Sequence, residues 1–391
     1  MKISVTLVLA LSVLAALTPT SDAGTVRLPV KSRQHGSVGS SAAARFERER
    51  VWTSDHFAVN APQRSTTPGV HGIRLHSHGG DFYFTEISFG TPPQMLELVL
   101  DTRTGDSSVP NVPIGAHNVY NHDASSTYQA NGSHFYNDWM GVSGYLSRDV
   151  VQIGDLALPR LLFGEVNDMG YFFGGFFGLG LESTNMATTE TLMARLIREG
   201  KLDQPMFGIH FARNQRDGEL TLGGVNASLF EGDLHFVDIA VQGHWSIMLE
   251  TITVGEESIP VEDAVMVYTL TPFIYGPMDV IDRLASSLGA KKDDYAYRIE
   301  CSASPPEVAF VIGGRAFAIT KEDYIVKTNG GWCILAMSGG REWSVGKPFL
   351  RRYYTAFDAD EHQPRIGFAL ALESAARALA PPLHEREPSE P

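Results

Sequence analysis

Basic residues are scarce in this chain of 391 residues, because 31 Lys and Arg stand against 45 Asp and Glu, for a formal net charge of −14. A protein that binds nucleic acid presents a basic face to the phosphates. This sequence lacks the surplus of positive charge that such a face requires, so we expect no nucleic-acid partner. Its length is enough for two domains, and a content of 43% hydrophobic residues allows a sizeable core.

Long apolar runs are also scarce. The run ISVTLVLALSVLAAL follows Lys2 and precedes TPTSDAG, an arrangement typical of a secretory signal peptide at residues 1–23. A membrane anchor is the alternative, but the run is short and no stop-transfer charges follow it. We therefore expect no membrane span and a place in the secretory pathway, either extracellular or lysosomal. Two glycosylation sequons, at Asn131 and Asn226, agree with export.

Cysteine occurs twice, at Cys301 and Cys333. In a secreted chain an even pair favours a disulfide, and closing a loop of about 33 residues would stabilise the fold by about 3 kcal/mol. A metal site needs more ligands than this pair supplies, so we expect none.

A polar, irregular segment at residues 24–75 is typical of a propeptide-like leader. Three histidines near its end, His71, His76 and His78, could suggest a metal site. No carboxylate or cysteine completes a ligand set at familiar spacing, and we interpret this stretch as a polar linker before the first strand.

From Phe82 onward the sequence alternates between apolar and polar residues in short runs, with turn signals between them. This texture is typical of a mostly-β protein. Apolar residues at helical spacing predict short helices within residues 188–202 and 278–290. The Ala-, Glu- and Pro-rich residues 373–391 predict a flexible tail.

A weak internal repeat relates the two halves of this body. The first half has a buried strand that runs into Asp101 in VLDTRTG, followed later by GFFGLG at residues 175–180. The second half has VMVYTLT, with Tyr268 in the matching place, followed by WSVGKPF at residues 343–349. Such a duplication predicts a site at the interface of two similar lobes.

Several stretches carry a specific resemblance, among them ISFGTPPQ, GELTLGG and VGKPFLRRYYTAFD. On these motifs, from about Phe82 to Leu372, the chain resembles the pepsin-like aspartic peptidase family, peptidase A1, and its cathepsin D-like members. The resemblance implies a monomeric, bilobal fold with a central cleft and a flap hairpin. It places the N-terminal lobe at residues 76–235 and the C-terminal lobe at residues 236–372. It also implies the Cys301–Cys333 disulfide.

In the family, two Asp carboxylates share a proton and hold a water between them, without metal, cofactor or covalent intermediate. One acts as base on the water and the other donates to the scissile carbonyl, and their pKa values separate because both cannot ionise easily. The family has Asp-Thr-Gly in both catalytic loops. This chain departs from that pattern at three positions: Arg103 and Leu270 replace the two glycines, and Tyr268 replaces the second Asp.

The rest of the two loops stays close to pattern, with Asp101, Thr102 and Thr104 in the first and Thr269 and Thr271 in the second. A phenol is neutral at acid pH and cannot exchange a proton as a carboxylate does. We therefore interpret Asp101 as a retained loop carboxylate that accepts hydrogen bonds from buried backbone N–H groups and hydroxyls. The alternative is a catalytic role, which would need another acid. An ion pair with Arg103 could hold Asp101 ionised.

The flap and its surroundings also depart from the family. The usual flap Tyr falls on Asn137, with Tyr136 beside it, and the tip carries Trp139. Tyr136 could serve only through a one-residue shift. The usual Trp after the first loop is Ser108, and the usual Asp after the lobe-2 glycine is Lys347.

The sequence supports two hypotheses. The favoured one is a secreted, glycosylated, pepsin-fold protein that has lost peptidase activity and keeps a cleft for a peptide or protein ligand. The alternative is an active acid aspartic endopeptidase that uses Asp101 and an unidentified substitute acid. Tyr268 is the feature that argues against the alternative.

Overall fold

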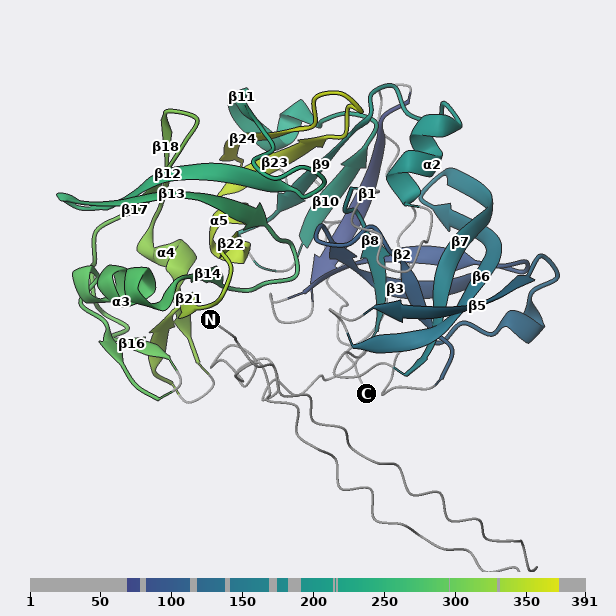
Figure 1. Ribbon diagram of the computed structural model, residues 1–391, viewed down its shortest axis with the longest axis horizontal. Helices are drawn as coiled ribbons and strands as arrows, with labels where there is room; N and C mark the ends of the chain where they lie inside the picture. Colours follow the sequence, from purple (N-terminus) through teal and green to yellow (C-terminus); the bar gives the residue numbers. More distant parts are fainter. Residues whose placement is uncertain are drawn as a thin grey trace, which may run out of the picture. The chain divides into compact units, whose positions relative to one another are not determined.

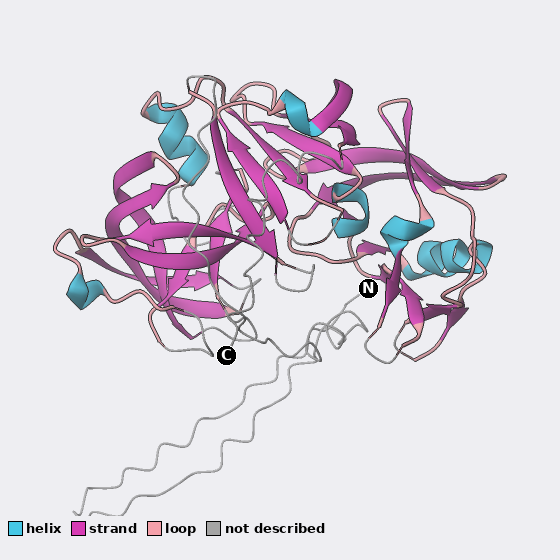
Figure 2. Cartoon of the chain, turned by 180° about the vertical axis from the view of Figure 1, so that it is seen from behind, coloured by secondary structure: helices cyan, strands magenta, loops and turns pink. Residues whose placement is uncertain are grey.

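The computed structural model describes residues 69–77, 82–112, 118–137, 141–168, 174–181, 191–213, 215, 217–294, 296–328 and 331–372. The expected signal peptide, almost all of the leader and the tail after residue 372 lie outside this set. Within the described residues, no helix is both long and apolar enough to cross a bilayer. Strands make up most of what is described, as Figures 1 and 2 show, and the expectation of a mostly-β fold is confirmed.

The largest sheet among the described residues has thirteen strands, in the order β11-β24-β23-β9-β10-β1-β2-β3-β8-β4-β7-β6-β5. It combines the first half of the body with two strands from the C-terminal end. Its members are β1 (His71–Ser77), β2 (Tyr83–Phe89), β3 (Gln94–Asp101), β4 (Ser108–Pro110), β5 (Gln129–Asn137), β6 (Val142–Ile153), β7 (Leu156–Asp168), β8 (Gly175–Gly178), β9 (Met206–Phe211), β10 (Asp217–Leu222), β11 (Phe230–Asp238), β23 (Tyr353–Asp358) and β24 (Arg365–Ala371).

Two smaller sheets and short helices form the second half. A seven-stranded sheet has the order β18-β17-β12-β13-β22-β14-β21, and a four-stranded sheet has the order β15-β16-β20-β19. Their strands are β12 (Ser246–Val254), β13 (Glu257–Val267), β14 (Ile274–Gly276), β15 (Lys291–Lys292), β16 (Tyr297–Ile299), β17 (Val308–Ile312), β18 (Arg315–Ile319), β19 (Ile325–Lys327), β20 (Cys333–Leu335), β21 (Met337–Gly339) and β22 (Ser344–Val345). The described helices are η1 (His122–Ala124), α2 (Leu192–Arg198), η3 (Ala227–Leu229), α3 (Met278–Ser287), α4 (Lys321–Tyr324) and α5 (Lys347–Leu350).

The internal repeat is visible in the strand pairing. In the first half, β3 runs parallel to β8, and β4 runs antiparallel to β8. In the second half, β13 runs parallel to β22, and β14 runs antiparallel to β22. The strand before Asp101 and the strand before Tyr268 therefore occupy matching places, as the sequence comparison of the two halves predicted.

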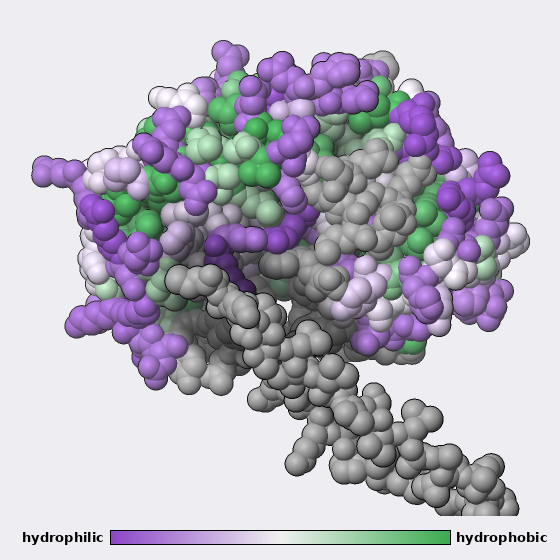
Figure 3. All heavy atoms as spheres, viewed as in Figure 1, coloured by the Kyte–Doolittle hydropathy of each residue, from purple (hydrophilic) through white to green (hydrophobic). Residues whose placement is uncertain are grey.

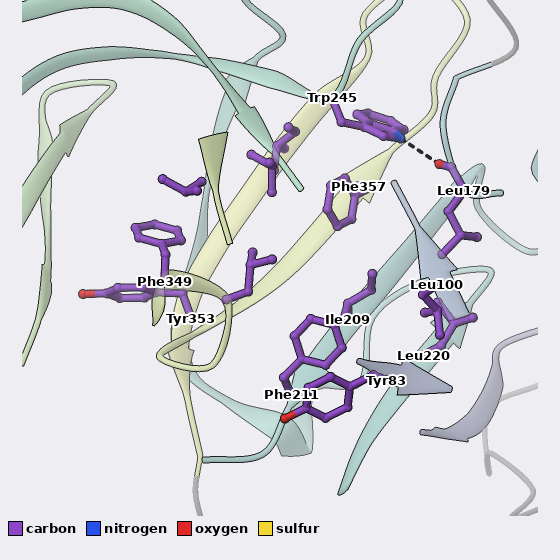
Figure 4. Close-up of a cluster of buried hydrophobic side chains, with 14 of the residues drawn as sticks. Tyr83, Leu100, Leu179, Ile209, Phe211, Leu220, Trp245, Phe349, Tyr353 and Phe357 are labelled. Carbon is purple, nitrogen blue, oxygen red and sulfur yellow. Dashed lines mark hydrogen bonds between the residues drawn. The ribbon is translucent and has the colours of Figure 1, made fainter. Parts of the chain in front are cut away.

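A buried aromatic core joins the two halves. Trp245 donates a hydrogen bond from its indole Nε1 to the carbonyl of Leu179 at 2.8 Å, and it packs edge-on against Phe357 and Phe207. Figure 4 shows Trp245 and Phe357, with residues from β2, β9 and β23 gathered around them. On the face drawn in Figure 3, hydrophilic residues interleave with smaller hydrophobic patches.

One interpretation from the sequence is wrong. His71 and His76 do not lie in a polar linker: both belong to strand β1, which pairs with β10 and spans the expected boundary between residues 75 and 76. Ile73 and Leu75 alternate into the core between them. His71 Nδ1 lies 2.7 Å from an Asp155 carboxylate oxygen.

Candidate active site

The two loops that resemble the family's catalytic loops are bound to each other through their threonines. Thr102 Oγ1 donates to the Val267 carbonyl at 2.8 Å and accepts from the Thr269 N–H at 3.1 Å. Thr269 Oγ1 reciprocates, donating to the Leu100 carbonyl at 2.9 Å and accepting from the Thr102 N–H at 3.1 Å. All these groups are buried. The two halves therefore meet where the sequence repeat predicted a site.

A second pair of threonines binds each loop to the glycine-containing segment that comes later in the same half. In the first loop, the Thr104 carbonyl accepts from the Gly180 N–H at 3.0 Å. In the second, the Thr271 carbonyl accepts from the Lys347 N–H at 3.0 Å.

Two glycines allow this close approach of strand to loop. A Cβ on Gly178 would lie 2.5 Å from the carbonyl oxygen of Gly105. A Cβ on Gly346 would likewise lie too close to the carbonyl oxygen of Thr271. Only glycine fits at such positions.

Asp101 is fully buried at the end of β3, next to Thr102 of the junction. Its Oδ1 accepts a hydrogen bond from the Arg103 N–H at 2.8 Å, while its Oδ2 has no hydrogen-bond partner among the described residues. Burial raises the pKa of the Asp101 carboxyl to about 7, against the opposing N–H bonds from Arg103 and Thr104. A carboxylate in this place is therefore protonated at acid pH.

Sequence reasoning missed one carboxylate near the site. Asp106 lies in the same loop, is 2% exposed, and adds a further increase to the pKa of Asp101 through its charge. Its backbone N–H is held by Thr104 Oγ1 at 3.0 Å. The feature of the sequence that could have identified Asp106 is its position at the end of a hydroxyl-rich turn.

Arg103 does not pair with Asp101, although the sequence allowed it. None of the ion pairs found among the described residues joins these two side chains. Instead, Arg103 Nη2 lies 3.1 Å from Glu342 Oε2, and its guanidinium is 5.9 Å from the centre of the Tyr268 ring, within cation–π range. The side chain therefore reaches from the first loop to residues of the second half.

The side chains of Tyr268 and Leu270 reach from the second loop into the first half. Both pack against a cluster of first-half apolar side chains, which we call the flap-side cluster: Phe84, Val99, Phe135, Val142, Leu146, Leu162, Val166 and Phe176. Leu270 is 4% exposed, and Tyr268 is partly buried. A loop that has glycine and aspartate in the family has here become an apolar contact between the halves.

Lys347 follows the second glycine and is completely buried. Its ammonium donates to the Thr269 carbonyl and lies 5.6 Å from the Tyr83 ring centre and 5.2 Å from that of Phe211. This lysine holds the backbone of the second loop.

The expected flap hairpin is formed by β5 and β6, which pair antiparallel up to Asn137 and Val142. Trp139, at its tip, lies outside the described residues. Asn137 is 2% exposed, whereas Tyr136 is 57% exposed. Because neighbouring residues of a strand point to opposite faces, Tyr136 cannot replace the usual flap Tyr without a change of register.

The expected disulfide is present between Cys301 and Cys333. Of the two sequons, Asn131 is exposed, while Asn226 caps η3 and donates from Nδ2 to Glu219 Oε1 at 2.9 Å. Asn131 is therefore the more accessible of the two side chains. Within the described residues, no group of three or more His, Cys, Asp or Glu side chains could hold a metal ion.

The fold and its duplicated, threonine-linked loops define a bilobal β-protein of the aspartic peptidase type. A family model described as eukaryotic aspartyl protease matches residues 82–371. The chain belongs to this family, the pepsin-like peptidases A1, as its motifs indicated.

Curated relatives agree with this assignment. Renin from Rattus norvegicus is 32% identical over 321 residues, which cover 74% of this chain and 79% of the renin. Cathepsin D from Chionodraco hamatus is 29% identical over 405 residues, covering 93% and 99% of the two chains. Cathepsin E from Aquarana catesbeiana is 30% identical over 380 residues, covering 88% and 93%.

Proposed function

We propose that this chain is an aspartic peptidase homologue that does not hydrolyse peptide bonds and that binds a peptide or protein segment in the cleft between its lobes. One observation carries the proposal. Tyr268, a phenol, stands at the place in the second loop that corresponds to Asp101 in the first. The two-carboxylate mechanism has no second carboxylate there.

The state of Asp101 supports the loss of activity. A shared-proton pair works because one carboxyl is ionised and acts as base while the other remains an acid. The pKa of Asp101, raised by burial to about 7, leaves it protonated at the acid pH where this chemistry runs. The first loop then supplies an acid and no base.

The preserved framework supports a binding role. The threonine contacts between the loops and the β5–β6 hairpin are retained, although the catalytic carboxylate of the second loop is replaced by Tyr268. Tyr268 and Arg103 bring an aromatic ring and a guanidinium to the junction, and both residue types are enriched in the central contacts of protein interfaces. We place the protein in the secretory pathway as a glycosylated monomer without metal or cofactor.

The alternative, an active acid endopeptidase, has one observation in its favour. Asp106 is a buried carboxyl whose charge acts on Asp101, so it is the described residue that could serve as the substitute acid. Both groups belong to one loop, however, and do not face each other across the two halves.

The test is hydrolysis of a denatured protein at about pH 3.5, with and without pepstatin, a pH between the two pKa values that such a pair can have. The chain is used with its leader removed, and Asp101→Asn is the control. We expect no cleavage by either protein. Cleavage that pepstatin blocks and Asp101→Asn abolishes would refute the loss of activity, and Asp106→Asn would then identify the acid.

The binding role is tested separately, by equilibrium binding of a library of random octapeptides to the same folded protein. We expect saturable binding of a related set of sequences. The control is a variant in which Tyr268→Ala removes the ring at the junction, and it should lose most of that binding. If all peptides of the library were retained equally and without saturation, the binding role would be refuted. The result of the cleavage assay would not be affected.

A further inference from the structure

A pocket of about 250 Å³ lies on the first half of the chain, lined by Gln129, Arg148, Arg160 and Arg195. These residues come from β5, β6, β7 and α2, four elements that lie next to each other in Figure 1. None of them takes part in the loop junction described above. Three arginines thus line one pocket of a protein whose net charge is −14.

The backbone of β7 holds two of the arginines in place. Arg148 Nη1 donates to the carbonyl of Arg160 at 3.3 Å, and Arg195 Nη2 donates to the carbonyl of Pro159 at 3.2 Å. Because these carbonyls belong to consecutive residues, the two guanidinium groups are anchored at the same point of the strand. Their positions are therefore set by the fold as well as by the rotamers of long surface side chains.

The charges around the pocket do not cancel. Arg195 Nε pairs with Glu199 Oε1 at 2.5 Å, which offsets one cation. No ion pair to Arg148 or Arg160 occurs among the described residues. Two positive charges therefore remain without a described acidic partner.

The backbone at Arg160 is unusual. Its φ is 57°, in the left-handed region that residues other than glycine avoid, and the pairing of β6 with β7 shifts register nearby, between Asp149 and Val151. Such strain persists where the surrounding structure fixes it, and it concentrates at functional positions. A glycine would adopt this conformation without strain, so the arginine side chain is the feature to explain.

We propose that this pocket binds a tetrahedral oxyanion, the phosphate or sulfate group of an ester. The planar guanidinium fork matches the paired oxygens of such a group and binds them bidentately. Gln129 also lines the pocket, and its side-chain amide is a neutral hydrogen-bond donor. The pocket is smaller than the roughly 300–1,000 Å³ of sites for whole drug-sized ligands, which suits one charged group with the rest of the molecule outside.

The test is isothermal titration of the folded chain with inorganic phosphate and with sulfate, at physiological ionic strength. We expect saturable binding that Arg160→Gly weakens about tenfold or more, as for loss of a charged hydrogen-bonding partner. Because glycine accepts the left-handed conformation, the same variant should melt no lower than the original chain. Arg315→Gln, which removes an exposed arginine on β18, is the matched control and should bind as before.

The pH dependence then distinguishes the two sources. A phosphate ester, whose second pKa is about 6, loses charge between pH 7 and pH 5, so its affinity should fall across this range, whereas a sulfate ester keeps its charge and its affinity. A sugar phosphate and a sugar sulfate are compared in this way. Absence of saturable binding of either anion, or equal weakening by Arg160→Gly and Arg315→Gln, would overturn the proposal.

Discussion

Replacing Asp101 by asparagine should change how the free energy of unfolding depends on pH. The carboxyl is fully buried, and this burial raises its pKa from 3.8 to about 7. Asparagine keeps an oxygen that can accept from the Arg103 N–H, but it does not titrate. The variant therefore removes one titration from the folded protein while keeping the shape of the loop.

The sign follows from where the protons are. Between pH 3.8 and about 7 the folded protein holds a proton on Asp101 that the unfolded chain has released. Stability linked to this group is therefore fully present below pH 3.8, falls as the pH rises, and is lost by about pH 7. At about 1.4 kcal/mol for each pH unit between the two pKa values, the total change is about 4 kcal/mol.

The assay is urea unfolding of the original chain and of Asp101→Asn at intervals from pH 4 to pH 8. All other titrating groups cancel in the difference between the two proteins. We expect that difference to shift by about 4 kcal/mol in favour of Asp101→Asn as the pH rises. Asp106→Asn removes a charge that raises the pKa of Asp101, so it should narrow the pH range over which this stability difference changes. Parallel stability curves for the original chain and Asp101→Asn would refute the reasoning.

Two other changes test the links that hold the halves together. Thr102→Val leaves the Thr269 N–H and the Val267 carbonyl without their partner and should cost about 2–4 kcal/mol of unfolding free energy, whereas Thr102→Ser, which keeps the hydroxyl, should stay near the original value. Equal losses in both variants, measured by urea unfolding, would contradict the hydrogen-bond account. Replacing Cys301 and Cys333 together by serine should cost about 3 kcal/mol in the same assay, and no loss would show that the bridge adds no stability.

Much of the fold was predictable because short-range patterns determine it. Alternation of apolar and polar residues marked β2 and β3, and the turn between them falls at Gly90–Pro93. The repeat of a strand, a threonine-rich loop and a later glycine predicted two similar lobes with a site at their interface. The same alternation, at Ile73 and Leu75, was present in β1, but the surrounding histidines and glycine suggested a linker.

The contacts between the halves were not predictable in the same way. The sequence showed that Thr102 and Thr269 are retained, but not that each hydroxyl bonds the backbone of the opposite loop, 167 residues away along the chain. Arg103 appeared beside Asp101 in sequence, yet its guanidinium lies on Glu342, because a long side chain is directed by the surface it can reach and not by its neighbour.

The three loop substitutions act as one unit, and this gives a final prediction. Tyr268→Asp alone would put a carboxylate into the second loop, but Leu270 would still fill the flap-side cluster and Arg103 would still reach from the first loop to Glu342. We expect that variant to remain inactive. With Arg103→Gly and Leu270→Gly added, cleavage sensitive to pepstatin should appear at about pH 3.5, at a cost in stability of about 2–5 kcal/mol from the lost leucine. Assays of the single and triple variants on one denatured substrate decide the matter. Equal cleavage by both would mean that the missing carboxylate alone accounts for any inactivity, and that the contacts of Arg103 and Leu270 leave the chemistry untouched.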